Sequence, residues 1–423
     1  MRRFRRLVSR GGPVARYRAE WPQITWASAP GALERLLVEN IMGFWDERVI
    51  DPAGGYRLAL DARARRRRGV PRRVVTQART MCFFSQLARS SYGEARHLEW
   101  AAHGFAFLRE RVWDHRHGGF FWELQGDEPS DDRKHLYGQA FGLLSLLEFA
   151  RAAQSEPALE LAQELFELIE RRTHDDRFGG YGESWLRDWR PEPAGSMDVI
   201  GAPAGHKTIN AQMHLMSALT VMIEADPAGG PRQRLRELIS IAGDRAVSRN
   251  PAGYPNLHED DWTPSPGWRS SFGHDLEVVA ITLRACRVAG HPDAGLLAVW
   301  EAIWENVLRN GFDHERGGVY NEGEPGRPAD RLEKIWWVQA EALLSALLMH
   351  QRTGARRYQD AFVRTLDWIV RGQADWERGD WYNQIARDGT VSGDKAGPWE
   401  CPFHQGRAML DCLARPLTPE TSA

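Results

Sequence analysis

The segment DHRHGGFFWELQGDEPSDDRKHLYGQAFGLLSLLEFA, residues 114–150, contains most of the unit from which this chain is built. It begins with an acidic residue followed by the pair Gly118 and Gly119, which indicates a tight turn with positive φ. It ends with a stretch that is apolar nearly all round, as in a helix that is buried on every side. Before the turn, apolar side chains recur at helical spacing from Leu98 to Val112, which predicts an outer, amphipathic helix.

The same unit recurs along the chain at steps of 61 to 73 residues. The copies of the turn are DPAGGY (51–56), DHRHGGF (114–120), DDRFGGY (175–181), NPAGY (250–254), DHERGGV (313–319) and ERGDWY (377–382). The apolar helices also begin in a common register, at TQAR (76–79), GQAF (138–141), AQMH (211–214), HDLE (274–277), VQAE (338–341) and HQGR (404–407). A periodicity of this length is typical of repeat architectures.

Six outer–inner helix pairs closed into a ring predict an all-α (α/α)6 barrel with short hairpins at its mouth. An open superhelical solenoid is the alternative arrangement of the same repeats. No linker rich in Pro, Gly or Ser separates the repeats, so we expect one catalytic domain over residues 20–415. Residues 1–19 and 416–423 are expected to be loose termini.

Composition excludes several classes of protein. The 423 residues are 42% hydrophobic and 26% charged, which is ordinary for a globular protein. The formal net charge is −2 and no run of 18 apolar residues occurs, so we expect neither a nucleic-acid nor a membrane partner. The four cysteines form no CxxC pair, and no apolar stretch follows the basic N-terminal residues, as a secretory signal would require. We therefore expect free thiols and a cytoplasmic monomer or homodimer.

The ring would bring the last residue of each inner-helix start to one mouth, and most of these residues are polar. A buried hub would carry Leu, Val or Ala instead. The six are Arg79, Phe141, His214, Glu277, Glu341 and Arg407, and neighbouring register positions add Tyr137, Asn210, His274, Trp336 and His404. Charged and aromatic residues around a barrel mouth predict a polar ligand pocket. The 18 tryptophans favour a carbohydrate ligand, because the C–H faces of sugars pack on indole.

Two histidines at equivalent positions of the fourth and sixth repeats, His274 and His404, suggest acid–base chemistry. Imidazole titrates near neutrality and can both accept and donate a proton. Two such groups on opposite faces of one carbon are what inversion of a C–H centre requires. Glu277, on the same helical face as His274, would orient it or hold substrate hydroxyls, and Arg79 would stabilise an enediolate oxygen.

Other interpretations of these residues remain open. A metal could use His274, Glu277 and His214, but no HExxH or CxxC framework accompanies them, so we expect no metal. Glu277 and Glu341 could be the two catalytic carboxylates of a glycosidase, but this interpretation gives neither histidine a role. A non-catalytic sugar-binding barrel is a further alternative. The basic cluster at 63–73 is either a solvated loop or a surface near the mouth that favours anionic sugars or an acidic partner.

The segments GGFFWEL with KHLYGQAF, KTINAQMH, SFGHDLE, KIWWVQAEA and PWECPFHQGR resemble the N-acylglucosamine 2-epimerase superfamily, in its cellobiose 2-epimerase and mannose 2-epimerase-like branch. The resemblance runs from about Gly31 to Asp411 and implies an (α/α)6 barrel. It implies His274 and His404 as the catalytic acid–base pair. It also implies substrate contacts from Arg79, Tyr137, Asn210, His214, Glu277, Trp336, Glu341 and Trp399.

The chemistry that the resemblance implies is opening of a sugar ring, removal of the C2 proton and reprotonation through an enediol, without cofactor or metal. Relatives that isomerise mannose to fructose return the proton to C1 instead. We therefore predict a cofactor-independent 2-epimerase of glucose/mannose or cellobiose-type reducing sugars. The alternative is an aldose–ketose isomerase of the mannose isomerase kind.

Overall fold

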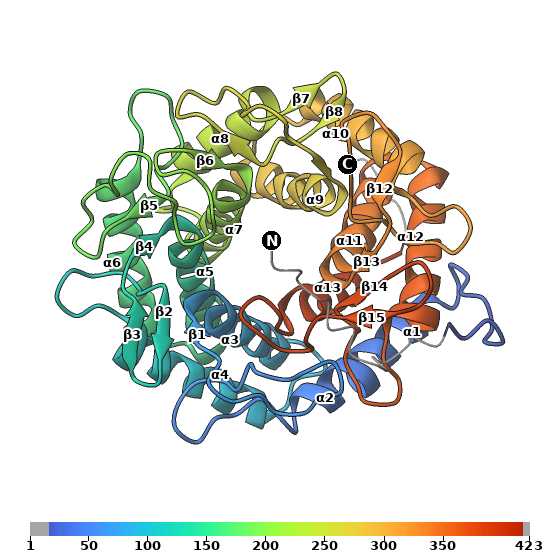
Figure 1. Cartoon of the computed structure of the whole chain (residues 1–423), viewed down its shortest axis with the longest axis horizontal. Coiled ribbons are helices and arrows are strands. Elements are labelled where there is room, and N and C mark those ends of the chain that lie inside the picture. The colour runs from blue at the N-terminus through green and yellow to red at the C-terminus, as the bar shows by residue number, and fades with distance from the viewer. Residues whose placement is uncertain (1–16, 418–423) are drawn as a thin grey trace, which may run out of the picture.

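The structure is a computed structural model that describes residues 17–417. Its helices form two concentric layers around a central axis (Figure 1). The inner layer consists of α3 (Val74–Arg89), α5 (Leu136–Ala153), α7 (Ile209–Ala225), α9 (Phe272–Ala289), α11 (Trp336–Thr353) and α13 (Phe403–Leu413). The outer layer consists of α1 (Ala29–Arg35) with α2 (Gly43–Trp45), α4 (Ala95–Phe107), α6 (Glu156–Thr173), α8 (Arg232–Ser240), α10 (Ala294–Asn306) and α12 (Arg356–Trp368).

The ring of helices is closed. The last inner helix, α13, packs against both α11 and the first inner helix, α3 (Figure 1). The predicted (α/α)6 barrel is therefore confirmed, and the open solenoid is excluded. In residues 17–417 five π-helical turns, which the periodicity did not predict, extend or interrupt the outer helices: η1 (Leu36–Met42), η2 (Leu108–Val112), η3 (Ile241–Arg245), η4 (Val307–Gly311) and η5 (Ile369–Gln373).

Short antiparallel strands link each repeat to the next. The strand before an inner helix pairs with the strand that follows the turn of the following repeat. These pairs are β1 (Arg72–Arg73) with β2 (Glu123–Gln125), β4 (Lys134–His135) with β5 (Ser184–Trp185), β6 (Lys207–Thr208) with β9 (Leu257–His258), β10 (Ser270–Ser271) with β11 (Glu322–Gly323), and β13 (Lys334–Ile335) with β14 (Gln384–Ile385). A bridge between Leu60 and Ala396 joins the sixth repeat to the first.

Five further strands in the described residues complete the hairpins. They are β3 (Glu128–Asp131), β7 (Ser248–Arg249), which pairs with β8 (Ala252–Gly253), β12 (Ala329–Arg331) and β15 (Val391–Ser392). In the described residues, β1, β4, β6, β10 and β13 each run directly into the N-terminal end of an inner helix. The hairpins therefore hold the helix ends that carry the predicted site residues.

A glutamine in the first turn of an inner helix fixes that helix to its own Gly-Gly turn in four repeats. Its Oε1 accepts a hydrogen bond from the backbone N–H of the residue after the turn, and its Nε2 donates to the carbonyl of the same residue. We call this pair of bonds the glutamine clamp. The N–H···O and Nε2···O distances are 2.8 and 2.9 Å for Gln77 with Tyr56, 2.8 and 2.8 Å for Gln139 with Phe120, 3.1 and 2.8 Å for Gln212 with Tyr181, and 2.8 and 2.7 Å for Gln339 with Val319.

The clamp also explains the second glycine of the turn. Gly55 has a φ of +67°, and a Cβ atom on it would lie 2.6 Å from Oε1 of Gln77. A side chain at this position would therefore meet both an unfavourable backbone conformation and a steric clash. The Gly-Gly pair and the glutamine together fix the position of each inner helix relative to its turn, which is why both recur at matching intervals in the sequence.

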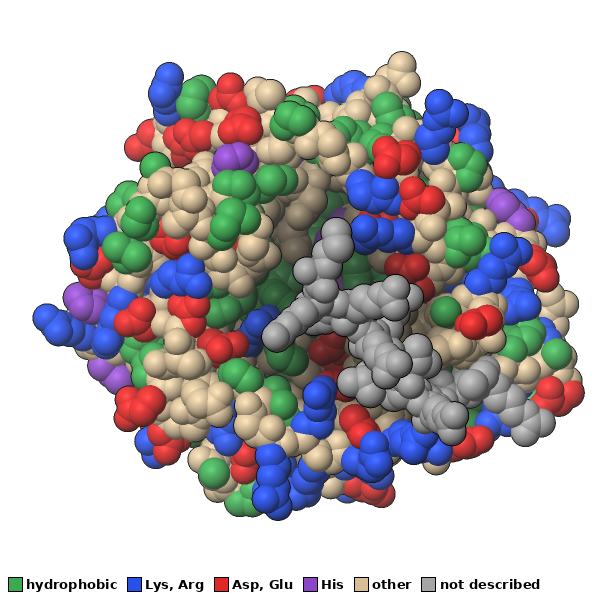
Figure 2. All heavy atoms as spheres, viewed as in Figure 1, with side chains coloured by type: hydrophobic (Ala, Val, Ile, Leu, Met, Phe, Trp, Pro, Cys, Tyr) green, Lys and Arg blue, Asp and Glu red, His purple; other side chains and the backbone are tan. Residues whose placement is uncertain are grey.

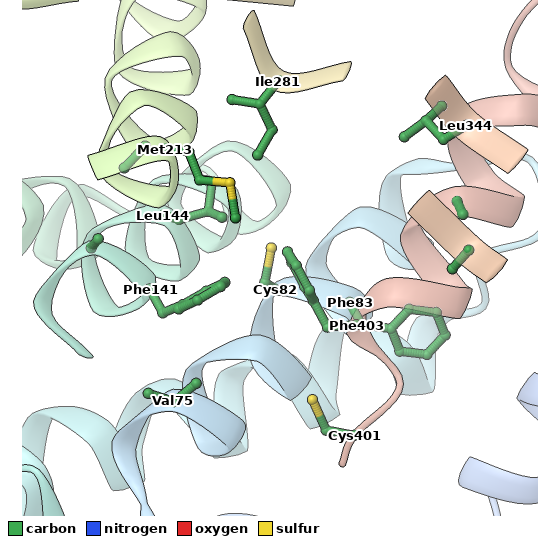
Figure 3. Packing of buried hydrophobic residues seen from close by; sticks show 14 of the residues in the cluster. Val75, Cys82, Phe83, Phe141, Leu144, Met213, Ile281, Leu344, Cys401 and Phe403 are labelled. Carbon is green, nitrogen blue, oxygen red and sulfur yellow. The ribbon is translucent and has the colours of Figure 1, made fainter. Parts of the chain in front are cut away.

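Apolar side chains form a core between the two layers and around the barrel axis. Side chains of several inner helices meet around the barrel axis, among them Phe141, Met213, Ile281, Leu344 and Phe403 (Figure 3). The four cysteines all lie in the described part of the chain and are free thiols, as expected, and all four are buried. Among the described residues, no helix has the length and apolar character that crossing a membrane requires.

The chain ends that the structure describes make specific contacts. The ring of Tyr17 stacks on Trp368 at 5.9 Å, and the N–H of Arg18 donates to the carbonyl of Arg371 at 2.8 Å. Near the other end, Gln351 donates to the carbonyl of Pro416 at 2.8 Å. Residues 1–16 and 418–423, the remainder of the segments expected to be loose, lie outside the described residues.

Candidate active site

A cavity of about 220 Å³ lies at the mouth of the barrel, and this face of the molecule is hollowed at its centre (Figure 2). The residues that line it are Arg79, Tyr137, Asn210, His214, His274, Glu277, Trp336, Trp337, Trp399 and His404. The structure thus brings together nine of the ten catalytic and substrate-contact residues that the family resemblance implied. The tenth, Glu341, is fully buried and bonds to His404. Trp337 was not predicted.

His404 is held by a carboxylate. Its Nδ1 lies 2.7 Å from Oε1 of Glu341, and Arg407 donates to both oxygens of Glu341 at 2.6 Å. Burial alone would raise the pKa of the Glu341 carboxyl, but the charge of Arg407 and the bond from His404 outweigh it and lower that pKa to about 2. Because an ionised carboxylate can only accept, Nδ1 of His404 carries the hydrogen and Nε2 keeps its lone pair.

Burial lowers the pKa of the His404 imidazole to about 4, although Glu341 opposes this shift. The ring is therefore neutral near pH 7, with its free nitrogen on the side away from Glu341. A neutral imidazole backed by a carboxylate can accept a proton, and the carboxylate then stabilises the imidazolium that forms.

His274 has a different environment. Its Nδ1 is buried and has no hydrogen-bond partner among the described residues. Its ring packs on Trp337 with a centroid distance of 4.8 Å, and the same indole lies 5.8 Å from the ring of His404. Burial lowers the pKa of His274 to about 4 as well. Trp337 therefore contacts both imidazoles, which come from helices on either side of its own.

Glu277 does not orient His274, contrary to one of the sequence interpretations. No hydrogen bond joins the two side chains in the described structure. Instead Oε1 of Glu277 lies 3.8 Å from Nε2 of His214 and 3.9 Å from Nδ1 of His404, and it has no hydrogen-bond partner there. Burial, with the nearby charge of Glu341, raises the pKa of the Glu277 carboxyl to about 8. The spacing of three residues on one helix does place both side chains in the cavity, but each faces different neighbours.

The other walls combine aromatic faces with unused polar atoms. Arg79 donates to the hydroxyl of Tyr137 at 2.6 Å, while its Nε has no partner in the described residues. Tyr137 lies 6.2 Å from Trp399, whose other neighbours include the guanidinium of Arg73 at 4.7 Å. Oδ1 of Asn210 is also buried without a partner in this part of the chain. Aromatic faces beside free donors and acceptors suit a ligand with C–H faces and hydroxyl groups.

This cavity in this barrel has counterparts in known proteins. The model of the N-acylglucosamine 2-epimerase (GlcNAc 2-epimerase) family matches residues 54–405. The chain belongs to this family. The family predicted from the sequence, and its class of carbohydrate epimerases and isomerases, are thereby confirmed.

Three similar proteins show the range of this N-acylglucosamine 2-epimerase family around the chain. A cellobiose 2-epimerase from Ruminococcus albus is 30% identical over 393 residues, which cover 90% of this chain and 97% of that protein. The structure of a cellobiose 2-epimerase from Bacillus thermoamylovorans matches with a TM-score of 0.85 and 26% identity, and it covers 92% of this chain and 100% of that one. A D-mannose isomerase from Marinomonas mediterranea is 22% identical over 394 residues, 89% of this chain and 95% of that protein.

One group of side chains in this family member has the spacing of metal ligands. Atoms of Glu277, Glu341 and His404 all lie within 4.8 Å of one another. However, Arg407 already donates to both oxygens of Glu341, and its guanidinium lies 4.0 Å from Oε1 of Glu277. A divalent cation bound there would be repelled by this buried positive charge. We therefore interpret the group as an ion-pair network that supports His404.

Proposed function

We propose that the protein is a sugar 2-epimerase that acts on reducing sugars of the glucose/mannose or cellobiose type and needs no cofactor. The observation that carries the proposal is the pair of imidazoles, His274 and His404, which line one small cavity on either side of Trp337. The cellobiose 2-epimerases among its relatives support the same reaction.

In the proposed reaction the sugar binds as its open-chain aldehyde. The lone pair of His404 Nε2 takes the proton from C2, and the electrons of the C–H bond form the double bond between C1 and C2 while the carbonyl oxygen becomes an enediolate. Glu341 stabilises the imidazolium that results. Arg79, which faces the cavity with an unpaired Nε, stabilises the enediolate oxygen.

Completion of the reaction requires a proton on the opposite face of C2. His274 enters this step as an imidazolium and donates to C2, the double bond collapses to restore the aldehyde, and His274 leaves as the neutral imidazole. In the reverse direction the two histidines exchange roles. Each regains its starting protonation state by exchange with solvent between turnovers.

The remaining residues of the cavity bind the substrate in this proposal. Trp336 and Trp399 pack on the faces of the sugar, and Tyr137, Asn210, His214 and Glu277 hydrogen-bond to its hydroxyl groups. Glu277, whose pKa is raised to about 8, is mainly protonated at neutral pH and can therefore also donate. Fixing the open chain between these groups sets both histidines against one carbon.

The second candidate function is an aldose–ketose isomerase, which the D-mannose isomerases among the relatives favour. Both reactions share the enediol, and they differ in whether the proton returns to C2 or to C1. Proton NMR of reactions with glucose, mannose and cellobiose in deuterated water distinguishes them. We expect the C2 epimer labelled at C2 with little ketose; ketose as the main product, labelled at C1, would replace the epimerase proposal with the isomerase.

We also propose that the protein acts in the cytoplasm as a monomer or homodimer, without nucleic-acid or membrane partners. Four free, buried thiols and a formal net charge of −2 support this proposal. Light scattering coupled to size-exclusion chromatography measures the oligomeric state, and a larger assembly would contradict it.

A further inference from the structure

The fourth repeat departs from the glutamine clamp. At the position of Gln77, Gln139, Gln212 and Gln339 it has Asp275, the residue directly after His274. Oδ1 of Asp275 accepts a hydrogen bond from the backbone N–H of Tyr254 at 2.7 Å, which is the first half of the clamp. The second half needs a donor, and an ionised carboxylate has none.

The second oxygen of Asp275, Oδ2, is the atom that would have to supply this donor. Oδ2 is buried without a hydrogen-bond partner in the described structure, and the whole side chain is 0% exposed. A Cβ atom on Gly253 would lie 3.3 Å from this oxygen, so the carboxyl group packs closely on the turn that it holds. Leaving a buried carboxylate oxygen unpaired costs free energy, whereas a protonated carboxyl can donate to a backbone carbonyl as the glutamine amides do.

No cation neutralises Asp275 in the described residues. The charged and titratable groups that act on the neighbouring Tyr254 are Asp275 itself, Arg249 on β7 and Cys286 on α9, and α9 also carries His274 and Glu277. Arg249 instead donates to the carbonyl of Gly243 and to Asp244. Burial therefore acts almost unopposed and raises the pKa of the Asp275 carboxyl to about 7.

We propose that Asp275 works as the neutral acid, with its O–H replacing the clamp amide, and that in this form it is a positioning residue for His274. The inference rests on the proposed function for the role of His274. The imidazole has no hydrogen bond of its own in the described structure, and Ser271 gives α9 no side-chain cap. The first turn of α9 thus depends on the Asp275 clamp and on the packing of Trp337 to place the ring.

The variant Asp275→Asn tests the protonation state without reference to activity. The unfolded carboxyl has a pKa near its ordinary value of 3.8, and the folded one has a pKa of about 7. The stability that neutral Asp275 contributes is therefore complete below about pH 4 and is lost as the pH rises through about 7. Asn supplies the same acceptor and donor but cannot ionise, so it loses nothing over this range.

We therefore expect the Tm of Asp275→Asn minus that of the wild type to increase from pH 4 to about pH 7 and then to level off. A difference that does not change with pH would overturn the proposal that Asp275 is neutral. This measurement remains valid even if the protein proves not to be an epimerase, so failure of the proposed function and failure of this inference are distinguishable.

The positioning role is tested by kcat and KM for C2 epimerisation between pH 6 and 9. The kcat of the wild type should fall at alkaline pH as Asp275 ionises, and Asp275→Asn should lack the part of this fall that Asp275 causes. Glu277, which also titrates in this range, is the same in both proteins and therefore affects both profiles equally. Asp275→Leu, which removes both halves of the clamp, should lower kcat at least tenfold at every pH with KM changed less than threefold. A wild-type alkaline decline that persists unchanged in Asp275→Asn would overturn the positioning role. If Asp275→Leu does not fold, the comparison of the pH profiles of the wild type and Asp275→Asn still tests the positioning role.

Discussion

The two histidines of the cavity have the same chemistry and the same lowered pKa, about 4, but opposite surroundings. His404 lies in a network of charges, in which Glu341 fixes its tautomer and Arg407 keeps Glu341 ionised. His274 lies in an aromatic contact, with no polar group bonded to its ring in the described residues.

This difference shows two ways to prepare an acid–base group in a buried site. The carboxylate commits His404 to one tautomer and stabilises its charged form, so the ring is ready to accept a proton. The ring of His274 is placed by its packing on Trp337 and by the position of the α9 backbone, and either of its nitrogens is left free to carry a hydrogen. The charges of Glu341 and Arg407 should therefore control proton transfer at His404. The position of the α9 backbone should control proton transfer at His274.

The largest effect should follow from removal of either imidazole. His404→Asn and His274→Asn should each lower kcat by about 10²-fold or more, since positioned general acid–base groups contribute on that order. Initial rates of epimerisation measure the loss. Near-wild-type activity in either variant would remove that residue from the mechanism.

The same two variants should differ in stability, which sharpens the comparison. His404→Asn loses the bond to Glu341 and should destabilise the fold by about 1–3 kcal/mol, the usual cost of disrupting a hydrogen bond to a buried charged group. His274→Asn breaks no hydrogen bond of its ring in the described structure and should change the free energy of unfolding less. Denaturant titration measures both, and equal losses would show that His274 has a polar partner after all.

Much of this site follows from repeat register alone. The Gly-Gly turns and the inner-helix starts recur at 61 to 73 residues, and once the ring closes, equivalent residues must meet at one mouth. Repeat register gives the level of a side chain along the barrel axis, but it does not show which neighbouring helix the side chain faces. For this reason it placed Glu341 and His404 near one another without showing their bond, and it paired Glu277 with His274, which the structure separates.

Two features were missed for different reasons. Trp337 neighbours Trp336 on α11, and adjacent helical residues point in different directions, so only one of the pair was expected at the mouth. In the structure both line the cavity. The clamp was visible in the sequence as the repeated Gln of TQAR, GQAF, AQMH and VQAE, but its partner is a backbone amide of the turn, which has no sequence signature.

A smaller effect should follow when the carboxylate behind His404 is neutralised. Glu341→Gln leaves the ring in place but removes the charge that stabilises its imidazolium, so kcat should fall by roughly tenfold to a hundredfold, less than for loss of the imidazole. Because Glu341 raises the pKa of His404 against the effect of burial, its loss should also move the acid limb of the pH–rate profile to lower pH.

Glu148→Gln is the matched control for that variant. Glu148 is also a buried glutamate that pairs with an arginine, Arg89, at 2.8 Å, but it lies toward the far end of α5 and does not line the cavity. It should lower Tm without moving the pH–rate profile. An unchanged profile in Glu341→Gln, or an equal change in both variants, would contradict the assignment of Glu341 as the group that controls His404.

The smallest effect should come from removal of metal ions. Glu277, Glu341 and His404 have ligand atoms within 4.8 Å of one another, so the charged side of the cavity is where a bound cation would act if one were needed. Arg407 already supplies a permanent positive charge there, with two hydrogen bonds to Glu341. Proton transfer between carbon and imidazole does not require a Lewis acid, because hydrogen-bond donors stabilise the enediolate oxygen. Dialysis against a strong chelator should therefore leave kcat and KM unchanged, and subsequent addition of Zn²⁺, Mn²⁺ or Mg²⁺ should not raise the rate. Activity that is lost on chelation and restored by one of these ions would mean that the cluster binds metal despite Arg407, and that the contrast between the two histidines lies in metal coordination instead of ion pairing.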